Sequence, residues 1–567
     1  SVTDQVPMQP QEQDSRKGPH PKDGGLLQDK PRAGHRRSRV PALITGLIGI
    51  AHVILLAYAA AANQINLNTD GIAYLRLASY YADWNTPLMI SGYWGPLLSW
   101  MAAVWIKLGL PALTAGRVSM ALAAVVFAWG SRAFLRALPL QAWAQQVGFG
   151  LAALCSVFWS VEYISPDLLV AGLVCFATAR MIRPAWAERP REAGAAGVLW
   201  GLAYLAKAVA LPLTFAAGAA IAFLWQARRA CSTTTVLRRL AATWCAGLIV
   251  GLPWMIVLSV HYHAPTFSTS ARIAHAVVGP PDVDRYHPFA RTFHKPDPGR
   301  ITAWEDPSEM AYRYWSPLKN LHYFTHQARV IGRNTLTVLT LVGGFDLLHM
   351  GLAGLAAGLF LALRHRGAIS RSWLLMPALV FCIGLNYLPV YVEIVDQRYF
   401  YACYPLLWGA MTGGMIWLGT TRSGLRRTLA WVLGGFGLVS FLAPAVLGLM
   451  MALTGVPDPA SACANDLAKR MRTAGVAGPI AGSGLVRGGR TGLYLAYLLE
   501  QPWYGDIQKP TAAEYEKCGA RVIVVNRQQA IAMELETHSA FISLDDRLLG
   551  SEEEASLCPV QVFELRR

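Results

Sequence analysis

The chain has 567 residues, of which 54% are hydrophobic and only 15% are charged. Soluble globular proteins carry about a quarter charged residues, and apolar runs of bilayer-spanning length recur along this chain, so the sequence predicts a polytopic membrane protein and excludes a soluble one. The net charge of +16 does not indicate nucleic-acid binding, because Lys and Arg stand mostly in short clusters between the apolar runs. We expect no nucleic-acid partner.

The first segment, residues 1–40, is polar, rich in Pro and Gly, and ends with the basic stretch HRRSR. It predicts a disordered cytoplasmic tail rather than a signal peptide. A transmembrane domain is expected over residues 41–453. Its eleven candidate spans are 41–62, 113–135, 144–161, 167–182, 195–209, 211–226, 238–260, 346–363, 373–391, 399–419 and 426–453.

The run 195–226 is divided into two passes. As one helix it would be about 48 Å long, which is more than an upright membrane helix needs. Pro212 lies near its middle, and both of its ends are basic. We therefore predict an outward turn between Lys207 and Pro212.

With eleven passes and a cytoplasmic N-terminus, the basic clusters gather on the cytoplasmic side, as the positive-inside rule requires. These clusters are HRRSR (35–39), Arg180 to Arg191, Arg228 and Arg229 with Arg238 and Arg239, RHR (364–366) with Arg371, and Arg422 to Arg427. Three long segments, 63–112, 261–345 and 454–567, then lie outside. We expect a multi-pass protein of the plasma (cell inner) membrane whose C-terminal domain is extracytoplasmic.

The outer segments differ in character. The first predicts two amphipathic interfacial helices at about 71–83 and 96–108. The second is rich in His, Pro, Tyr and Trp. The last, 454–567, predicts a small α/β domain with a helix at 464–475, strands at 478–484 and 520–527, and a helix or strand at 491–505. The expected fold class is therefore mostly α, a membrane helical bundle with interfacial helices and a small C-terminal α/β domain.

Cysteines of the C-terminal segment could form a disulfide. Cys463, Cys518 and Cys558 lie in this polar region. If it is outside the cytoplasm, two of the three could pair. The sequence leaves open which two.

Ionisable residues at the mouths of membrane helices are costly, and they indicate function. The predicted topology places six of them on the outer face, namely Asp70, Arg117, Glu162, Asp167, Lys207 and Arg398. A carboxylate there could act as a general base on an acceptor hydroxyl or amine. Lys and Arg could bind a phosphate diester and stabilise the leaving phosphate.

Simpler roles compete with this chemistry. Asp70 and Asp167 could be helix caps, Glu162 a solvated loop charge, Lys207 a snorkelling side chain, and Arg117 and Arg398 anchors for lipid headgroups. His261 and His263 could suggest a metal, but they lack a ligand-spacing motif. A transporter or lipid flippase is the alternative function, although such proteins usually place their charges near the midplane and often contain repeats.

At this point several stretches resemble one family, the type-C (GT-C) polytopic glycosyltransferases that use polyprenyl-phosphate sugars. The branch they resemble includes the aminoarabinose transferase of lipid A and the rhizobial galacturonosyltransferases, with the protein O-mannosyltransferases as more distant members. The stretches are NTDGIAYLRLA (68–78), GYWGPLLSWMAAVWIKLG (92–109), AGRVSMALAA (115–124), SPDLLVAGL (165–173), GLAYLAKAVALPL (201–213) and QRYFYACYPLL (397–407), in the family's order.

The resemblance implies inverting transfer of a sugar from a polyprenyl-phosphate donor to an extracytoplasmic lipid, glycan or protein. Asp70 would be the catalytic base and Asp167 the second acid. Lys207 and Arg398, with Arg117, would face the donor phosphate. Candidate contacts of the acceptor or sugar are Tyr74, Glu162 and Tyr399. No organic cofactor is expected, and we expect a monomer surrounded by membrane lipids.

Two positions depart from the family's pattern. Many relatives carry a second acid beside the first, whereas Asp70 is followed by Gly71. A single acid makes a metal-bridged site less expected, and metal dependence stays open. The second interfacial helix opens with Gly95–Pro96 instead of a Pro-Pro-like segment.

Overall fold

The structure is a computed structural model that describes residues 40–228, 231–283, 287–344, 375–389, 396–419, 424–483, 488–548 and 558–566. The predicted tail up to residue 39, the predicted span 346–363 and the basic cluster 364–366 lie outside the described residues.

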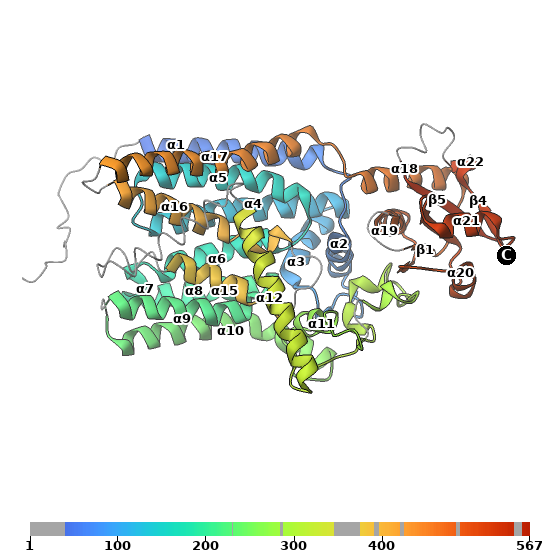
Figure 1. The fold of residues 1–567 in the computed structure, drawn as a ribbon, viewed down its shortest axis with the longest axis horizontal. Coiled ribbons are helices and arrows are strands. Elements are labelled where there is room, and N and C mark those ends of the chain that lie inside the picture. The colour runs from blue at the N-terminus through green and yellow to red at the C-terminus, as the bar shows by residue number, and fades with distance from the viewer. Residues whose placement is uncertain are drawn as a thin grey trace, which may run out of the picture.

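A bundle of long helices makes up most of the molecule (Figure 1). Its members are α1 (Val40–Ala62), α4 (Ala112–Ala137), α5 (Ala142–Glu162), α6 (Asp167–Met181), α8 (Pro190–Ala206), α9 (Ala210–Arg228), α10 (Thr233–His261), α15 (Leu375–Leu385), α16 (Cys403–Gly419) and α17 (Gly424–Thr454). Five described segments are long and apolar enough to cross a membrane; four are α1, α4, α5 and α10, and the fifth begins within α17. The protein is a multi-pass membrane protein, and the count of eleven passes stays a prediction.

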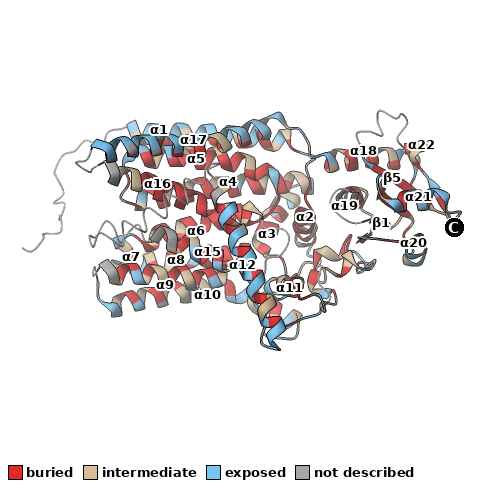
Figure 2. Ribbon diagram, viewed as in Figure 1, coloured by how far each residue is buried: buried red, intermediate tan, exposed pale blue. Residues whose placement is uncertain are grey.

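The outer surface of the bundle is apolar, as a bilayer requires. On α1 the side chains of Leu43, Leu47, Ile50 and Ile54 are exposed, whereas Ala59 is buried. Figure 2 shows the same division, with exposed residues on the outward faces of α1 and α17 and buried ones between the helices. Such a contiguous apolar face suits contact with lipid tails.

The predicted break in the run 195–226 is confirmed. Helix α8 ends at Ala206 and α9 begins at Ala210, with Lys207 in extended backbone between them. A Cβ on Gly95 would lie 2.2 Å from the carbonyl oxygen of Ala206, so the glycine at the start of α3 allows that helix to touch the end of α8.

Both predicted interfacial helices exist, as α2 (Thr69–Ala82) and α3 (Pro96–Lys107). Helix α2 is more enclosed than an interfacial helix on a free surface, because nine of its residues are buried. It lies between the bundle and the C-terminal domain (Figure 1), and Ile72 packs with Ile301 and Leu493.

The outer segment 261–345 holds more regular structure than its sequence predicted. It contains α11 (Ser270–Ala276), the short 3₁₀ turns η1 (Pro288–Ala290), η2 (Ala303–Glu305) and η3 (Pro307–Glu309), and the 23-residue helix α12 (Leu321–Gly343). The Asn320 side chain caps α12 by accepting from the Tyr323 amide. Helix α12 crosses the bundle obliquely (Figure 1).

The C-terminal domain is a small α/β unit, as predicted. Its elements are α18 (Pro459–Ala474), β1 (Ile480–Ser483), α19 (Gly488–Leu499), β2 (Trp503–Ile507), α20 (Ala512–Cys518), β3 (Val522–Asn526), α21 (Ala530–Thr537), β4 (Phe541–Ser543), α22 (Asp545–Leu548) and β5 (Val560–Leu565). The sheet order is β2-β1-β3-β5-β4, in which β2, β1 and β3 are parallel and β5 is antiparallel to both neighbours. The segment 491–505 is both helix and strand, divided between α19 and β2.

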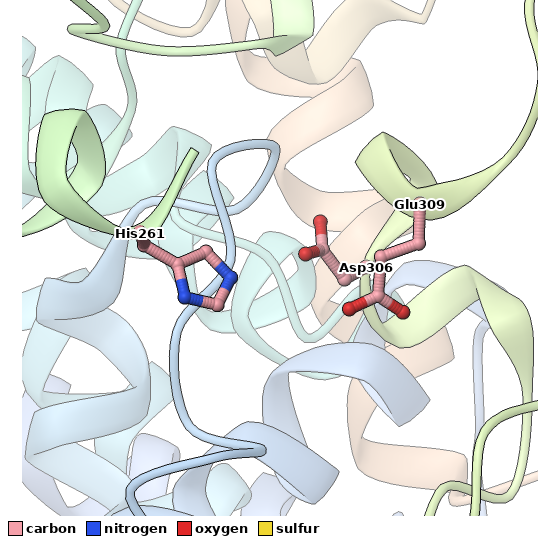
Figure 3. Close-up of side chains that lie close together, drawn as sticks. All are labelled: His261, Asp306 and Glu309. Atoms are coloured by element: carbon pink, nitrogen blue, oxygen red, sulfur yellow. The ribbon is translucent and has the colours of Figure 1, made fainter. Parts of the chain in front are cut away.

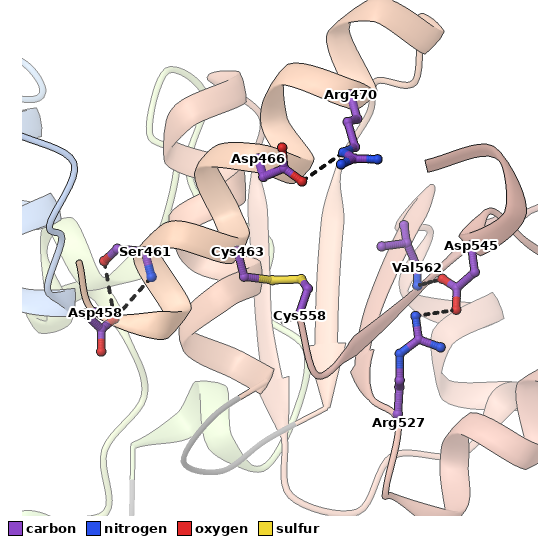
Figure 4. The surroundings of a disulfide bond; sticks show 9 residues. All are labelled: Asp458, Ser461, Cys463, Asp466, Arg470, Arg527, Asp545, Cys558 and Val562. Carbon is purple, nitrogen blue, oxygen red and sulfur yellow. Dashed lines mark hydrogen bonds and ion pairs between the residues drawn. A yellow bond between two sulfur atoms is a disulfide. The ribbon is translucent and has the colours of Figure 1, made fainter. Parts of the chain in front are cut away.

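A disulfide joins Cys463 of α18 to Cys558, which lies just before β5 (Figure 4). The Cα atoms are 5.2 Å apart, and the bridge spans 95 residues of sequence. Cys518 is free. Of the three cysteines considered from the sequence, the structure therefore pairs Cys463 with Cys558.

Backbone hydrogen bonds attach this domain to the outer loops. The Trp503 amide donates to the Ile301 carbonyl over 2.6 Å, and the His294 amide donates to the Tyr504 carbonyl over 2.7 Å. The 294–302 loop thus pairs with β2 at the edge of the sheet, and this pairing seats the domain over α2.

Candidate active site

Asn68 brings two distant loops together. Its side-chain oxygen accepts from the Ile164 amide over 2.9 Å, and its side-chain nitrogen donates to the Ile164 carbonyl over 3.3 Å. Because Asn68 stands before α2 and Ile164 before α6, this pair of bonds holds the starts of the two helices side by side. Asp70 and Asp167 both lie in the first turns of those helices.

Neither aspartate is a helix cap. The N-cap positions belong to Asn68 and Pro166, and neither makes a side-chain capping bond. The Asp70 carboxylate lies 2.6 Å from a terminal nitrogen of Arg398. The Asp167 carboxylate is buried and lies 2.5 Å from Lys207 Nζ. Both acids are engaged with cations, which a capping role does not explain.

Arg398 is the centre of the cluster. Besides Asp70, its Nε lies 3.2 Å from an Asp396 oxygen and 3.9 Å from an Asp167 oxygen. Asp396 also caps the 3₁₀ turn η5 (Gln397–Phe400) by accepting from the Arg398 amide. One guanidinium therefore faces three carboxylates, and Lys207 adds a second positive charge beside Asp167.

Aromatic rings enclose the two cations. Lys207 Nζ lies 4.0 Å from the centre of the Tyr399 ring, and the Arg398 guanidinium lies 4.9 Å from that of Tyr163. Tyr399 stacks on Tyr387 with ring centres 5.3 Å apart. Cation–π contacts of this kind strengthen when water is excluded, so the rings hold both cations in a partly dry pocket.

A cavity extends from this cluster into the bundle. Asp167 and Tyr399 are among its lining residues, and Tyr387 and Asn386 lie beside them. The wall formed by α6 continues with Val170, Ala171 and Val174, which share one face of the helix with Asp167 at i+3, i+4 and i+7. The lining is thus charged and aromatic where Asp167 lies and apolar along the helix.

Rings of the outer loops cover the side of the cluster beyond α2. Tyr74, one turn after Asp70, lies 5.1 Å from Trp94, and Trp94 lies 5.3 Å from Trp304 of η2. Burial raises the pKa of the Tyr74 phenol, and the charges of Asp167 and Asp70 raise it further. Tyr74 is therefore a neutral hydroxyl close to both acids.

His287 was not predicted from the sequence. Its Nδ1 lies 2.8 Å from the Tyr312 hydroxyl, and its ring contacts that of Trp304 at 4.8 Å. Although the residue keeps some exposure, these rings enclose its imidazole, and burial lowers its pKa to about 4, against a smaller opposing effect of Asp70. A neutral imidazole thus stands within electrostatic range of the proposed base.

Two of the predicted site residues, Arg117 and Glu162, make no ion pair with the Lys207–Arg398 cluster within the described residues. The buried Arg117 donates to the carbonyl of Val161 over 2.9 Å and to that of Asn66. These contacts hold the loop before α2, and the predicted role of Arg117 at the donor phosphate stays a prediction. Glu162 is exposed at the end of α5, and within the described residues no hydrogen bond or ion pair of its side chain is found.

Comparison with known proteins identifies solved structures of the same fold. No family model and no curated protein matches the chain. Crystal structures of ArnT from Cupriavidus metallidurans, bound to undecaprenyl phosphate and in the apo state, match with TM-scores of 0.53 and 0.52 at 16% identity. They cover 91% and 92% of this chain and 97% and 98% of ArnT. An apo oligosaccharyltransferase from Archaeoglobus fulgidus matches with a TM-score of 0.48 at 10% identity, over 86% of this chain and 70% of that one.

Nearly the whole length of both chains takes part in the likeness to ArnT, including the helical bundle and the C-terminal region. At this identity the likeness concerns the fold. The fold that the ordered motifs predicted is confirmed, and the chain has the architecture of the type-C (GT-C) polytopic glycosyltransferases.

Proposed function

We propose that the protein is a membrane glycosyltransferase that moves a sugar from a polyprenyl-phosphate donor to an extracytoplasmic acceptor with inversion. One observation carries the proposal above the others. A cavity is lined by Asp167 and Tyr399, both of which lie against Lys207 and Arg398, and it continues along an apolar face of α6. A polyprenyl phosphate matches this arrangement, because one end of the molecule is charged and its long hydrocarbon chain is apolar.

Lys207 and Arg398 would bind the donor phosphate. Charge-assisted bonds to phosphate are short and strong, and both cations are already held in place by carboxylates and rings. Val170, Ala171 and Val174 would contact the polyprenyl chain. ArnT, which has the same fold, has been crystallised with undecaprenyl phosphate, and this supports a donor of that class.

Asp70 would be the general base. In a single displacement the acceptor oxygen or nitrogen bonds to the anomeric carbon, the bond to the phosphate oxygen breaks, and the phosphate leaves with the electron pair. The acceptor proton goes to Asp70. Its salt bridge with Arg398 requires the ionised carboxylate, and a bound phosphate would compete for Arg398 and release Asp70 for the proton.

Asp167 would position the cations rather than take the proton, because it contacts Lys207 directly and lies 3.9 Å from Arg398. Tyr74 and Tyr399 would contact the sugar or acceptor, since their rings border the cluster. Glu162, exposed nearby, would contact an acceptor that approaches from outside. We further propose that the protein acts as a monomer in the inner membrane, with the acceptor on the extracytoplasmic side.

Asp70→Asn tests the assignment of the base. Mass spectrometry of envelope lipids and glycans from a deletion strain first identifies the product. Transfer from the matching undecaprenyl-phosphate sugar is then measured with purified full-length protein. We expect kcat to fall about 100-fold or more, and the donor KM should not rise, because Asp70 no longer competes with the phosphate for Arg398. Asp83→Asn, an exposed acid at the end of the same helix, is the matched control.

Full transfer by the Asp70→Asn variant would reject Asp70 as the base. Movement of the lipid across liposome membranes without any covalent product would instead support the alternative of a flippase.

A further inference from the structure

A second group of ligand-type side chains lies where α10 meets the 3₁₀ turn η3. We propose that His261, Asp306 and Glu309 bind a divalent metal ion of the zinc class. The ion would join the end of α10 to the loop that carries Trp304 and Glu305. This site is separate from the Lys207–Arg398 cluster and does not depend on the proposed transfer reaction.

The three side chains converge on one point. One donor atom from each lies within 4.8 Å of the other two, and Figure 3 shows the imidazole directed toward the two carboxylates. In a tetrahedral zinc site with bonds of about 2.1 Å, two ligand atoms lie about 3.4 Å apart. The exposed Glu309 side chain would turn toward the other two ligands to close the difference.

Local sequence explains why the two acids face the same side. Asp306 is the N-cap of η3 and accepts from the Ser308 amide over 3.2 Å. Glu309 is the last residue of that turn. The Glu309 amide donates to the Asp306 carbonyl over 3.2 Å, so this turn brings the two residues close together. His261, the last residue of α10, approaches from the opposite side.

Asp306 is already oriented as a metal ligand would be. It is 1% exposed, and its oxygens accept from the Ser91 hydroxyl at 3.0 Å and from the Tyr262 hydroxyl at 2.8 Å. A carboxylate has about four lone-pair sites, so these bonds leave acceptor capacity for an ion. Hydrogen bonds of this kind fix a ligand's orientation at metal sites.

The surroundings are rich in carboxyl groups. Asp297 is a hydrogen-bond neighbour of Glu309, and the buried Arg300 lies 3.4 Å from the Glu309 carboxylate. Three carboxyl groups therefore stand near one guanidinium, and a cation would offset the repulsion between them. A set of one imidazole and carboxylates suits zinc, whereas magnesium and calcium prefer oxygen ligands alone.

The ion would stabilise the cover of the candidate active site. The Glu305 carboxylate accepts from the Tyr80 hydroxyl of α2 over 2.7 Å, and the Trp304 carbonyl accepts from the Trp94 indole over 2.9 Å. Both belong to the turn that precedes η3. Fixing Asp306 and Glu309 to α10 would therefore hold this turn against α2 and α3.

The test measures zinc on full-length protein whose affinity tag has been removed. After treatment with a chelator, zinc chloride is titrated by calorimetry, and bound zinc is counted by elemental mass spectrometry after desalting. We expect one zinc per chain. His261→Asn and Glu309→Gln should each weaken zinc binding about 100-fold or more, a loss at least as large as that from removing a supporting group.

His263→Asn is the matched control, because His263 is two residues away and outside the group. Its φ of 53° also suits asparagine, which tolerates the left-handed region. Zinc should raise the Tm of the wild type and of this control but not of the two ligand variants, while all four share a similar zinc-free Tm. Absence of stoichiometric zinc on the wild type, or unchanged binding by His261→Asn and Glu309→Gln, would overturn the proposal.

Discussion

Gly71 has no room for a side chain. A Cβ on this residue would lie 2.5 Å from the Asn68 side-chain oxygen and 3.0 Å from Ile164 Cβ. The Asn68 side chain and Ile164, which are joined by hydrogen bonds, thus occupy the space that a side chain at position 71 would need. The way the two loops are joined leaves Asp70 as the single acid of this turn.

Gly71→Ala should therefore destabilise the protein. Overpacking of a close contact costs about 1–3 kcal/mol, so we expect a lower Tm in detergent-solubilised protein, together with reduced transfer as Asp70 and Asp167 move apart. Gly194→Ala is the control, because a Cβ there meets nothing within 4 Å. It should be neutral or stabilise α8 by up to about 1 kcal/mol. Equal stability of the two variants would refute the close approach at Gly71.

Arg117 and Arg398 should respond differently to replacement by lysine. Arg117→Lys loses hydrogen bonds to buried carbonyls, which we expect to cost about 1–3 kcal/mol of stability without altering the donor KM. Arg398→Lys keeps the charge but loses the forked geometry that suits phosphate. It should raise the donor KM about tenfold, a loss of about 1.4 kcal/mol.

Steady-state kinetics and thermal melts on both variants separate the two roles. A raised donor KM in Arg117→Lys would support the phosphate-binding role predicted from its sequence position.

Motifs in the sequence pointed to Asp70, Asp167, Lys207 and Arg398, and these four do lie in contact. Charged residues at the mouths of membrane helices are rare enough to be noticed. Their catalytic and binding roles stay predictions. His287 could not be found this way, since it is one of several histidines in a loop rich in them. Only the three-dimensional fold brings it near Asp70.

At the scale of elements, the sequence predicted those that depend on local signals. Pro212 and the flanking charges marked the break between α8 and α9. Helix α12 was missed because polar residues such as Arg329 and Arg333 alternate with apolar ones, so that the segment contains no continuous apolar run. For the segment 491–505 the sequence did not decide between a helix and a strand, and the reason is different. The segment joins a helix and a strand through the short turn at Glu500 to Pro502, and so has no single period.

The link between α18 and the chain before β5 is expected to be a strong constraint on the C-terminal domain. Removing a native disulfide from a small extracytoplasmic domain costs about 2–5 kcal/mol. Replacing Cys463 and Cys558 together by serine should lower the melting temperature of the domain and increase hydrogen exchange in β3 and β5. Cys518→Ser should change neither, because its thiol is free.

Mass spectrometry of a non-reducing protease digest of the membrane-extracted protein should detect two peptides, one with Cys463 and one with Cys558, joined by a disulfide. Recovery of both cysteines as free thiols from cells with an intact oxidising envelope would refute the pairing.

At the scale of the whole molecule, the seating of the C-terminal domain was beyond the reach of sequence. The Leu67 amide donates to the Ser461 hydroxyl over 3.0 Å, although 394 residues separate them. No local pattern reports such a contact. The consequence is that the domain covers α2 and the loops that carry the candidate active site, so both must lie on the same side of the membrane.

That shared side is open to a direct test. The basic clusters predict a cytoplasmic N-terminus, and eleven passes would bring the chain out before α18. The disulfide agrees, because such bonds persist outside the reducing cytoplasm. Alkaline phosphatase fused after Arg567 should be active, and green fluorescent protein at the same position should be dark. Fluorescent protein fused before Ser1 should fluoresce. If both ends report the cytoplasm, the number of passes is even, and the cluster around Asp70 faces the wrong compartment for an extracytoplasmic acceptor.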